Sequence, residues 1–273
     1  MYVTKADGRK EKFSFEKIVR TGLRAGVPRQ EAERIAREVE AESYDGIRTR
    51  EVLDMILRYF GERKTVYASK YDLKGAIMRL GPSGFPFEKL IAEMFEKLGY
   101  STVTDVTISG RCVSHEVDVI IEKESRRYMV ECKYRNFPGA YIGIHKALYV
   151  WARFLDLQAG NSLGRCGKLD APYLVCNTKF SDDTIQYASC MGLKLKGWNY
   201  PQDNSIAYIL TKNKIYPVTV LRTVNARTLQ LLSGAKMMFC DDLSEEKLTE
   251  IGIPRRRSKH IMGEVAGILA DNN

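Results

Sequence analysis

The sequence predicts a multidomain chain of the α+β and α/β classes, with a mainly helical N-terminal module, a central α/β module and a small all-α C-terminal module. Apolar residues recur at helical spacing through residues 15–79 and again beyond residue 219. Between these segments, helical stretches alternate with period-two apolar runs, which is typical of helices around a mixed sheet. The helix-breaking run Leu80–Gly84 separates the first two segments. We therefore expect domains at residues 1–80, 81–218 and 219–273.

Composition excludes several classes of protein. With 44% hydrophobic and 28% charged residues in a chain of 273, the sequence is that of a folded protein rather than a disordered one. No apolar run approaches the ~20 residues of a membrane span, and the charged N-terminus lacks the apolar core of a signal peptide. We therefore expect a cytoplasmic protein with no membrane partner.

The net charge and the cysteine spacing limit which kinds of partner and metal site the sequence supports. The formal net charge of +9 divides into +5, +3 and +1 over the three segments, so it is not a detachable basic tail. An excess of this kind favours a polyanionic partner without identifying it. The six cysteines contain no C-x-x-C pair, which argues against a structural zinc site.

The N-terminal segment predicts one hairpin followed by helices. Asp7-Gly8 is a favoured turn pair, so residues 1–13 should form a short hairpin. Ser14 and Thr49 are suitable N-caps because a hydroxyl can accept from free first-turn amides. We expect helices over residues 15–25, 29–44, 49–60 and 64–79.

The central segment predicts an amphipathic helix from Phe87 to Leu98, because its apolar residues fall three and four apart and Gly99 follows. Further along, the pattern predicts, in order, strands at 117–121 and 128–134, a helix at 143–157, a strand at 173–177, a helix between Ser181 and Gly192, and a strand at 193–198. The C-terminal segment carries apolar helical stretches at 229–232, 243–251 and 261–269.

Carboxylates gather on the predicted hairpin of the central segment. If its turn centres between Glu124 and Ser125, residues whose numbers sum to 249 face each other, so Asp118 lies opposite Glu131. Opposed carboxylates repel across a sheet, whereas Mg²⁺ prefers oxygen ligands and commonly takes one or two carboxylates. Lys133, on the same face as Glu131, could stabilise charge on a phosphate. The alternative is an ordinary solvent-exposed charged strand face.

The residues around this hairpin resemble a known family. Pro86-Phe87-Glu88, Glu116–Val119 and Val130–Lys133, with Asn177–Ser181 behind them, are similar to the Mrr-like restriction endonucleases of the PD-(D/E)xK nuclease superfamily. The resemblance implies a restriction-endonuclease-like α/β/α fold with a mixed sheet, a DNA substrate and Mg²⁺ or Mn²⁺. It implies Asp118 and Glu131 as metal ligands, Lys133 as the catalytic lysine and Glu88 as an assisting acid.

Two residues near this motif leave alternatives open. Glu116 could replace Asp118 as the metal ligand, although the cross-strand pairing favours Asp118. His115 could serve as a general base or could be an outer or surface residue. The family often has glutamine where Glu131 stands, and glutamate is an accepted variant.

The N-terminal hairpin and its following helix resemble the ATP-cone domain, a nucleotide-binding module, over nearly all of residues 1–80. This resemblance implies ATP or dATP as an effector, with Val3, Lys5 and Arg9 at the nucleotide. Because Lys5 and Arg9 flank the Asp-Gly turn, both side chains could reach a phosphate. The alternative is a basic hairpin that contacts the DNA backbone.

The C-terminal segment resembles a helix-hairpin-helix unit, with Gly252 in the hairpin where two glycines are typical. Such units bind the DNA backbone at the N-terminus of their second helix. The basic residues that would add phosphate contacts are Arg255, Arg256, Arg257 and Lys259. A packing or dimerisation role is the alternative, and a homodimer would follow from it.

Together the three segments predict a metal-dependent DNA endonuclease modulated by ATP or dATP. Two alternatives to this endonuclease remain, one that lacks catalytic activity and one that acts on a different DNA substrate. One is a non-catalytic, nucleotide-responsive DNA-binding regulator, and the other is a Holliday-junction resolvase with the same chemistry.

Overall fold

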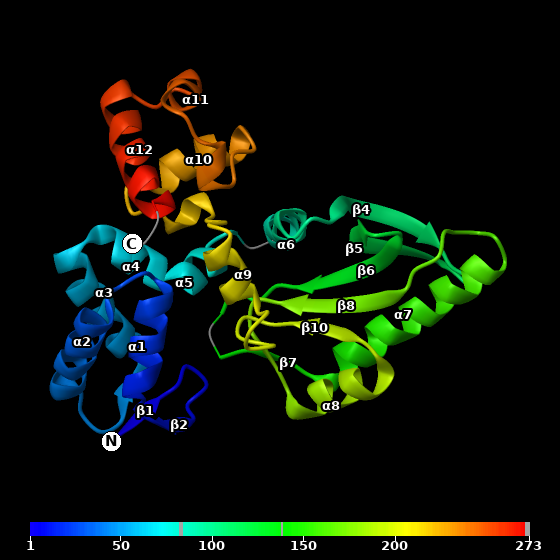
Figure 1. Ribbon diagram of the computed structural model, residues 1–273, viewed down its shortest axis with the longest axis horizontal. Helices are drawn as coiled ribbons and strands as arrows, with labels where there is room; N and C mark the ends of the chain where they lie inside the picture. The colour runs from blue at the N-terminus through cyan, green and yellow to red at the C-terminus, as the bar shows by residue number, and fades with distance from the viewer. Residues whose placement is uncertain (82–83, 138, 271–273) are drawn as a thin grey trace. The chain divides into compact units, whose positions relative to one another are not determined.

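A computed structural model describes residues 1–81, 84–137 and 139–270 (Figure 1). The expected linker Leu80–Gly84 includes Pro82 and Ser83, which lie outside these residues. Contacts divide the chain into a terminal unit, residues 1–79 together with 214–273, and a central unit, residues 80–213. The first and last segments of the chain therefore fold against each other. Across the residues described, no helix is both long and apolar enough to cross a bilayer.

The central unit is built on a five-stranded mixed sheet, ordered β10-β8-β6-β5-β4. β4, β5 and β6 are antiparallel neighbours, whereas β8 and β10 continue the sheet parallel to β6. The strands are β4 (Ser101–Ser109), β5 (Ser114–Lys123), β6 (Arg126–Lys133), β8 (Ala171–Cys176) and β10 (Lys194–Lys196), and a separate pair joins β7 (Tyr141–Ile142) to β9 (Lys179–Phe180).

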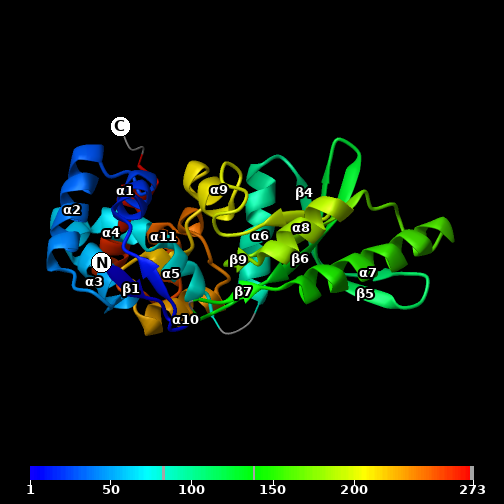
Figure 2. The same cartoon turned by 90° about the horizontal axis from the view of Figure 1, so that it is seen from below.

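Helices cover both faces of this sheet, as the views in Figures 1 and 2 show. The helices are α6 (Phe85–Lys97), α7 (Ile144–Ser162), α8 (Asp182–Met191) and α9 (Ile206–Lys212). Val150 and Phe154 of α7 share a buried core with Ile120 and Met129 of the sheet. On the other face, Phe95 of α6 packs edge-on against Tyr173. The mixed sheet between helical layers confirms the predicted fold class of this segment.

The terminal unit begins with the predicted hairpin, β1 (Tyr2–Thr4) and β2 (Lys10–Lys12), which β3 (Ile47–Arg48) extends to three strands. The helices that follow are α1 (Phe15–Arg24), α2 (Arg29–Glu42), α3 (Thr49–Arg63), α4 (Thr65–Tyr71) and α5 (Leu73–Met78). Ser14 accepts from the amide of Lys17, as expected of an N-cap. The single helix expected over residues 64–79 is divided at Asp72.

The C-terminal part of this unit is helical, as predicted. It comprises η1 (Val218–Val220), α10 (Ala226–Gly234), η2 (Cys240–Asp242), α11 (Glu245–Glu250) and α12 (Arg255–Leu269). Glu264 of α12 accepts from the amides of Arg222 and Thr223 at 2.8 and 3.0 Å. The hydroxyl of Ser69 on α4 donates to the same carboxylate at 3.3 Å. This buried acid therefore joins α12 to the N-terminal helices.

Candidate active site

The hairpin of β5 and β6 has the predicted register. Val119 faces Val130 and Lys123 faces Arg126, so paired residue numbers sum to 249. Glu124 and Ser125 form the two-residue turn, with φ angles of 52° and 60°. Positive φ at both positions matches the twist of the flanking strands. Local turn geometry thus determines which residues of β5 lie beside the end of β6.

The hydrogen-bonded pairing of β5 with β6 ends just before Asp118 is reached. The last β5–β6 pair before it joins Val119 and Val130. Asp118 Oδ2 instead accepts a hydrogen bond of 2.6 Å from the amide of Cys132. On the other side, Asp105 of β4 has a φ of 58°, and the pairs on either side of it hold β4 against β5. The Asp118 carboxylate is consequently directed at the end of β6, where Glu131 and Lys133 lie.

Glu131 is buried and paired at both oxygens. Its side chain is 4% exposed, Oε1 accepts from Lys133 Nζ, and Oε2 accepts from Arg153 Nη1 of α7. Arg153 Nη2 also donates to the main-chain oxygen of Glu116. A carboxylate this buried needs such partners because removing its charge from water is costly.

Mutual repulsion and burial perturb the other two acids. Burial, and then the charge of Glu131, raises the pKa of Asp118 to about 6, against the opposing hydrogen bond from Cys132. Burial also raises the pKa of Glu88 to about 7, and the charges of Asp118 and Asp105 add to the effect. Glu88 reaches this group from the first turn of α6. The structure thus brings Glu88, Asp118, Glu131 and Lys133 together.

The sequence leaves the roles of Glu116 and His115 open, and the structure places these two residues differently. Glu116 pairs with Thr107 of β4, its side chain is exposed, and its main-chain oxygen is held by Arg153. Asp118 is therefore the acid that shares the buried cluster with Glu131. His115 Nε2 lies 2.8 Å from Asp156 Oδ2 of α7. The hydrogen bond with His115 and that from the amide of Cys112 hold the pKa of Asp156 well below its usual range.

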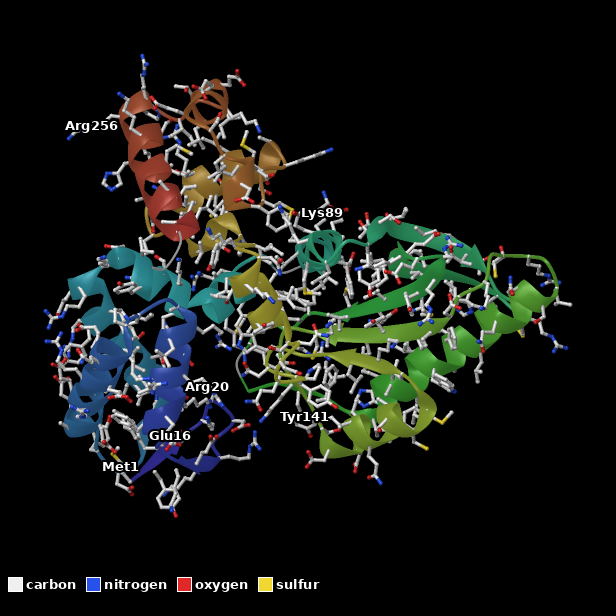
Figure 3. All side chains as sticks on the ribbon, viewed as in Figure 1. Met1, Glu16, Arg20, Lys89, Tyr141 and Arg256 are labelled. Atoms are coloured by element: carbon white, nitrogen blue, oxygen red, sulfur yellow. The ribbon has the colours of Figure 1, made fainter. Side chains whose placement is uncertain are left out.

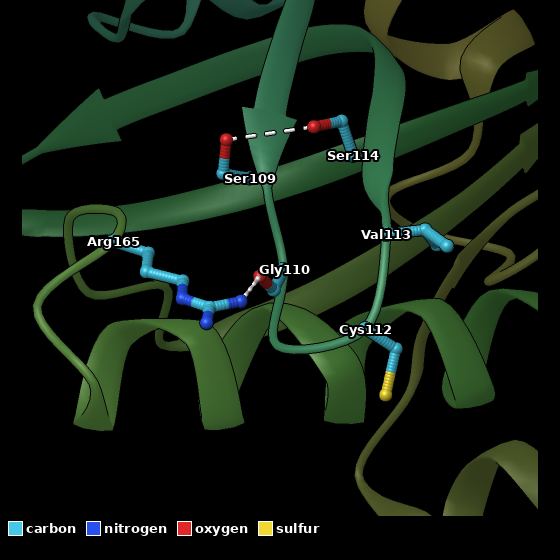
Figure 4. Close-up of a pocket in the computed structure, with 6 residues that line it drawn as sticks. All are labelled: Ser109, Gly110, Cys112, Val113, Ser114 and Arg165. Carbon is cyan, nitrogen blue, oxygen red and sulfur yellow. Dashed lines mark hydrogen bonds between the residues drawn. The ribbon is translucent and has the colours of Figure 1, made fainter.

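A shallow pocket lies at the tip of the β4–β5 hairpin (Figure 4). It is lined by Ser109, Gly110, Cys112, Val113, Ser114 and Arg165, none of which belongs to the carboxylate cluster. Asp156 accepts from the amide of Cys112 at 2.8 Å, and Arg165 donates to the main-chain oxygen of Arg111 at 2.6 Å. These contacts fasten the hairpin tip to α7 and so fix the start of β5.

The carboxylates fit a hard divalent cation. Two acids lie close enough for the charge of Glu131 to raise the pKa of Asp118, and a cation would relieve that repulsion. Each oxygen of Glu131 has a second lone pair beside the one that its ammonium or guanidinium partner occupies. Within the described residues, no three His, Cys, Asp or Glu side chains form a ready-made metal cage. Water and phosphate oxygens would complete the coordination, as they commonly do for Mg²⁺.

The raised pKa of Glu88 predicts how stability depends on pH. A carboxyl that binds its proton more tightly when folded stabilises the fold most at low pH. That contribution is lost as the pH rises from the unfolded value, ~4.3, through about 7. The Glu88→Gln variant has no ionisable group at this position, so it lacks this pH-dependent contribution. The unfolding free energy of the wild type should therefore fall relative to Glu88→Gln between these pH values and stay level above them. Urea unfolding of both proteins across pH 4–8 measures the difference, and a constant difference would contradict the expectation.

The residues predicted to bind a nucleotide lie around the N-terminal hairpin. Val3 is buried between β2 and β3, in the core of the terminal unit. Lys5 Nζ pairs with Glu11 at 2.7 Å, and Arg9 pairs with Asp7 across the turn at 2.5 Å. Lys17 of α1 was not predicted. Its ammonium group lies 3.8 Å from Glu11, the acid that also pairs with Lys5, so the two lysines lie near each other.

The predicted DNA-contacting residues lie within the first five residues of α12. Arg255, Arg256 and Lys259 are exposed, and Arg256 projects away from the helix in Figure 3. Arg255 also pairs with Glu245 at 3.4 Å. Arg257 is half-buried and donates to the main-chain oxygen of Thr223. Between α11 and α12, Gly252 has a φ of 88°, as the tight hairpin requires.

Comparison with known proteins identifies three domains in this order. Residues 1–72 match the ATP cone domain, residues 81–146 a restriction endonuclease domain, and residues 216–269 the AF1548-like C-terminal domain. An uncharacterized protein of Archaeoglobus fulgidus is 37% identical over 182 residues, which cover 66% of this chain and 99% of that protein. The crystal structure of AF1548, a protein of unknown function, has a TM-score of 0.57 and 36% identity over 68% of this chain and 98% of that one.

Proposed function

Because the chain belongs to the family of this Archaeoglobus fulgidus protein and joins an ATP cone domain to a restriction endonuclease domain, we propose that it is a metal-dependent DNA endonuclease that responds to a nucleotide. The observation that carries the proposal is the cluster of Asp118, Glu131 and Lys133. Half-buried Asp118 and buried Glu131 lie close enough for their charges to interact, and the ammonium group of Lys133 pairs with Glu131.

Each residue of the cluster has a distinct task in phosphodiester hydrolysis. Asp118 and Glu131 would hold the cation, which would neutralise phosphate charge and lower the pKa of a water. Lys133 stabilises the charge that develops on the phosphate as the water oxygen bonds to phosphorus and the ester bond breaks. Glu88, with a pKa of about 7, can accept a proton from the water or return one to the leaving oxygen near neutral pH.

Nicking of supercoiled plasmid tests this function. The purified chain should convert supercoiled DNA to open circles with Mg²⁺ or Mn²⁺, and EDTA should stop the reaction. Asp118→Ala and Lys133→Ala should each abolish it. Persistent cleavage in both variants would contradict the assignment. Tight DNA binding with no metal-dependent cleavage by the wild type would instead favour a DNA-binding regulator, and cleavage confined to four-way junctions would favour a resolvase.

We further propose that ATP or dATP binds at the N-terminal hairpin, where Lys5 and Lys17 share one anionic partner, Glu11. Lys5→Ala and Arg9→Ala should each weaken nucleotide binding by about tenfold, the effect of one charge-assisted hydrogen bond to phosphate. Isothermal titration calorimetry measures this. Arg50→Ala is the matched control, since Arg50, like Arg9, is exposed and paired with a neighbouring acid, Asp54. If all three variants bound the nucleotide equally weakly, the proposed binding site at the N-terminal hairpin would be contradicted.

The C-terminal domain is proposed to hold the DNA backbone through the first five residues of α12. Phosphate contacts release counterions, so the logarithm of the binding constant falls with the logarithm of salt concentration. The double change Arg256→Ala and Lys259→Ala should lower the magnitude of that slope by about 2 and weaken binding equally for all sequences. A fluorescence-anisotropy titration at several salt concentrations measures the slope. An unchanged slope would remove this surface from the DNA interface.

A further inference from the structure

Arg153 is the buried cation of the carboxylate cluster that the sequence motifs do not include. It lies on α7, 20 residues beyond Lys133, and its side chain is 9% exposed. Its guanidinium donates to Glu131 Oε2 and to the main-chain oxygen of Glu116, which belong to neighbouring strands. It also lies 5.3 Å from the ring centre of Tyr149, within cation–π range. Three contacts on three elements therefore fix its position.

Lys133, the other partner of Glu131, is held differently. Its side chain is 23% exposed, compared with 9% for Arg153. Among the residues that the structure describes, the carboxylate of Glu131 is the single hydrogen-bond partner of its ammonium group. A lysine ammonium is also a compact charge on a flexible stem, whereas a guanidinium binds as a rigid planar fork. The two cations of Glu131 thus differ in how readily they can leave.

From this contrast we infer that Arg153 is a positioning residue, which holds Glu131 by Oε2 in the metal-free and metal-bound states alike, while Lys133 at Oε1 gives way to the cation. The inference rests on the proposed function. It assigns Arg153 no contact with DNA. Partners that orient metal ligands typically change metal affinity by about 10- to 100-fold when they are replaced.

Arg153→Lys tests the positioning role without changing the charge. A lysine cannot form the fork that reaches both Glu131 and Glu116, so Mn²⁺ should bind about tenfold more weakly. Mn²⁺ binding is measured without DNA by electron paramagnetic resonance, and melting temperature checks the fold of the variant. Arg165→Lys is the matched control, because Arg165 is exposed and donates to main-chain oxygens at the hairpin tip. It should bind Mn²⁺ like the wild type.

The outcomes separate this inference from the proposed function. If the wild type binds Mn²⁺ and Arg153→Lys binds it equally well, the positioning role is overturned and the endonuclease remains. If the wild type binds no Mn²⁺, the metal-dependent function fails, and the inference fails with it.

A measurement on the wild type needs no variant that might misfold. In side-chain ¹⁵N spectra, the guanidinium protons of Arg153 should stay protected from solvent exchange when Mg²⁺ is added, while the Lys133 ammonium signal changes. Loss of protection at Arg153 on adding Mg²⁺ would overturn the inference, since it would mean that the arginine and not the lysine yields its place.

Discussion

Asp118→Asn and Lys133→Met should each reduce the rate of DNA cleavage by at least about 10²-fold at saturating Mg²⁺, the scale seen when one preorganised charge-stabilising group is removed. Asparagine keeps the shape of Asp118 and can still accept from the Cys132 amide, so the loss would report the carboxylate charge. Methionine keeps the length of Lys133 and removes its ammonium group. Single-turnover cleavage of a labelled duplex measures both rates.

Glu122→Gln is the matched control for these variants. Glu122 lies on the same strand as Asp118 and is exposed opposite Arg127. Its replacement removes one acid from β5 without touching the cluster, so the cleavage rate should stay within about twofold of the wild type, as for a surface change remote from the chemistry. A comparable loss in Glu122→Gln would mean that the charge of the strand in general, and not Asp118, supports cleavage.

Arg153→Met should destabilise the central unit by about 3–5 kcal/mol, the usual cost of removing one partner of a buried ion pair. Glu131, 3% exposed, would retain a buried charge with Lys133 alone beside it. Both tryptophans of the chain, Trp151 and Trp198, lie in the central unit. Urea unfolding followed by tryptophan fluorescence therefore reports on this unit.

The double variant Arg153→Met and Glu131→Met separates the two parts of that cost. Replacing both charges with apolar side chains of similar length removes the uncompensated acid, and such replacements are often neutral or stabilising. The double variant should therefore recover most of the lost stability while remaining inactive. If the double variant were as unstable as Arg153→Met, lost packing rather than the unpaired charge of Glu131 would be responsible.

Local patterns predicted the register of the β5–β6 hairpin because the turn encodes it locally. The Glu124-Ser125 turn determines the register, and the register places Asp118 beside Glu131. The fold class and the three-domain resemblance followed from helical periodicity and from motifs that lie close together in sequence. The end of the β5–β6 ladder before Asp118 did not follow, nor did the interruption of the β4–β5 pairing at Asp105, which has a φ of 58°.

Long-range features were missed for the same reason. β4 was not predicted, although six of the nine residues of Ser101–Ser109 are β-branched. It is an edge strand whose side chains are largely exposed, so it lacks the apolar signal of a buried strand. Arg153 is one arginine in an otherwise amphipathic helix, and only the packing of α7 on the sheet brings it to Glu131. The joining of α12 to α4 through Glu264 is likewise invisible in the sequence.

The central claim is that Asp118 and Glu131 hold a divalent cation for DNA hydrolysis. The most direct test is a crystal grown with Mn²⁺ and measured at a wavelength where manganese scatters anomalously. The claim predicts an anomalous peak at about 2.0–2.2 Å from oxygens of both carboxylates, within the range for small divalent cations bound by oxygen. A fully loaded crystal with no peak there, or with manganese bound only elsewhere, would contradict it.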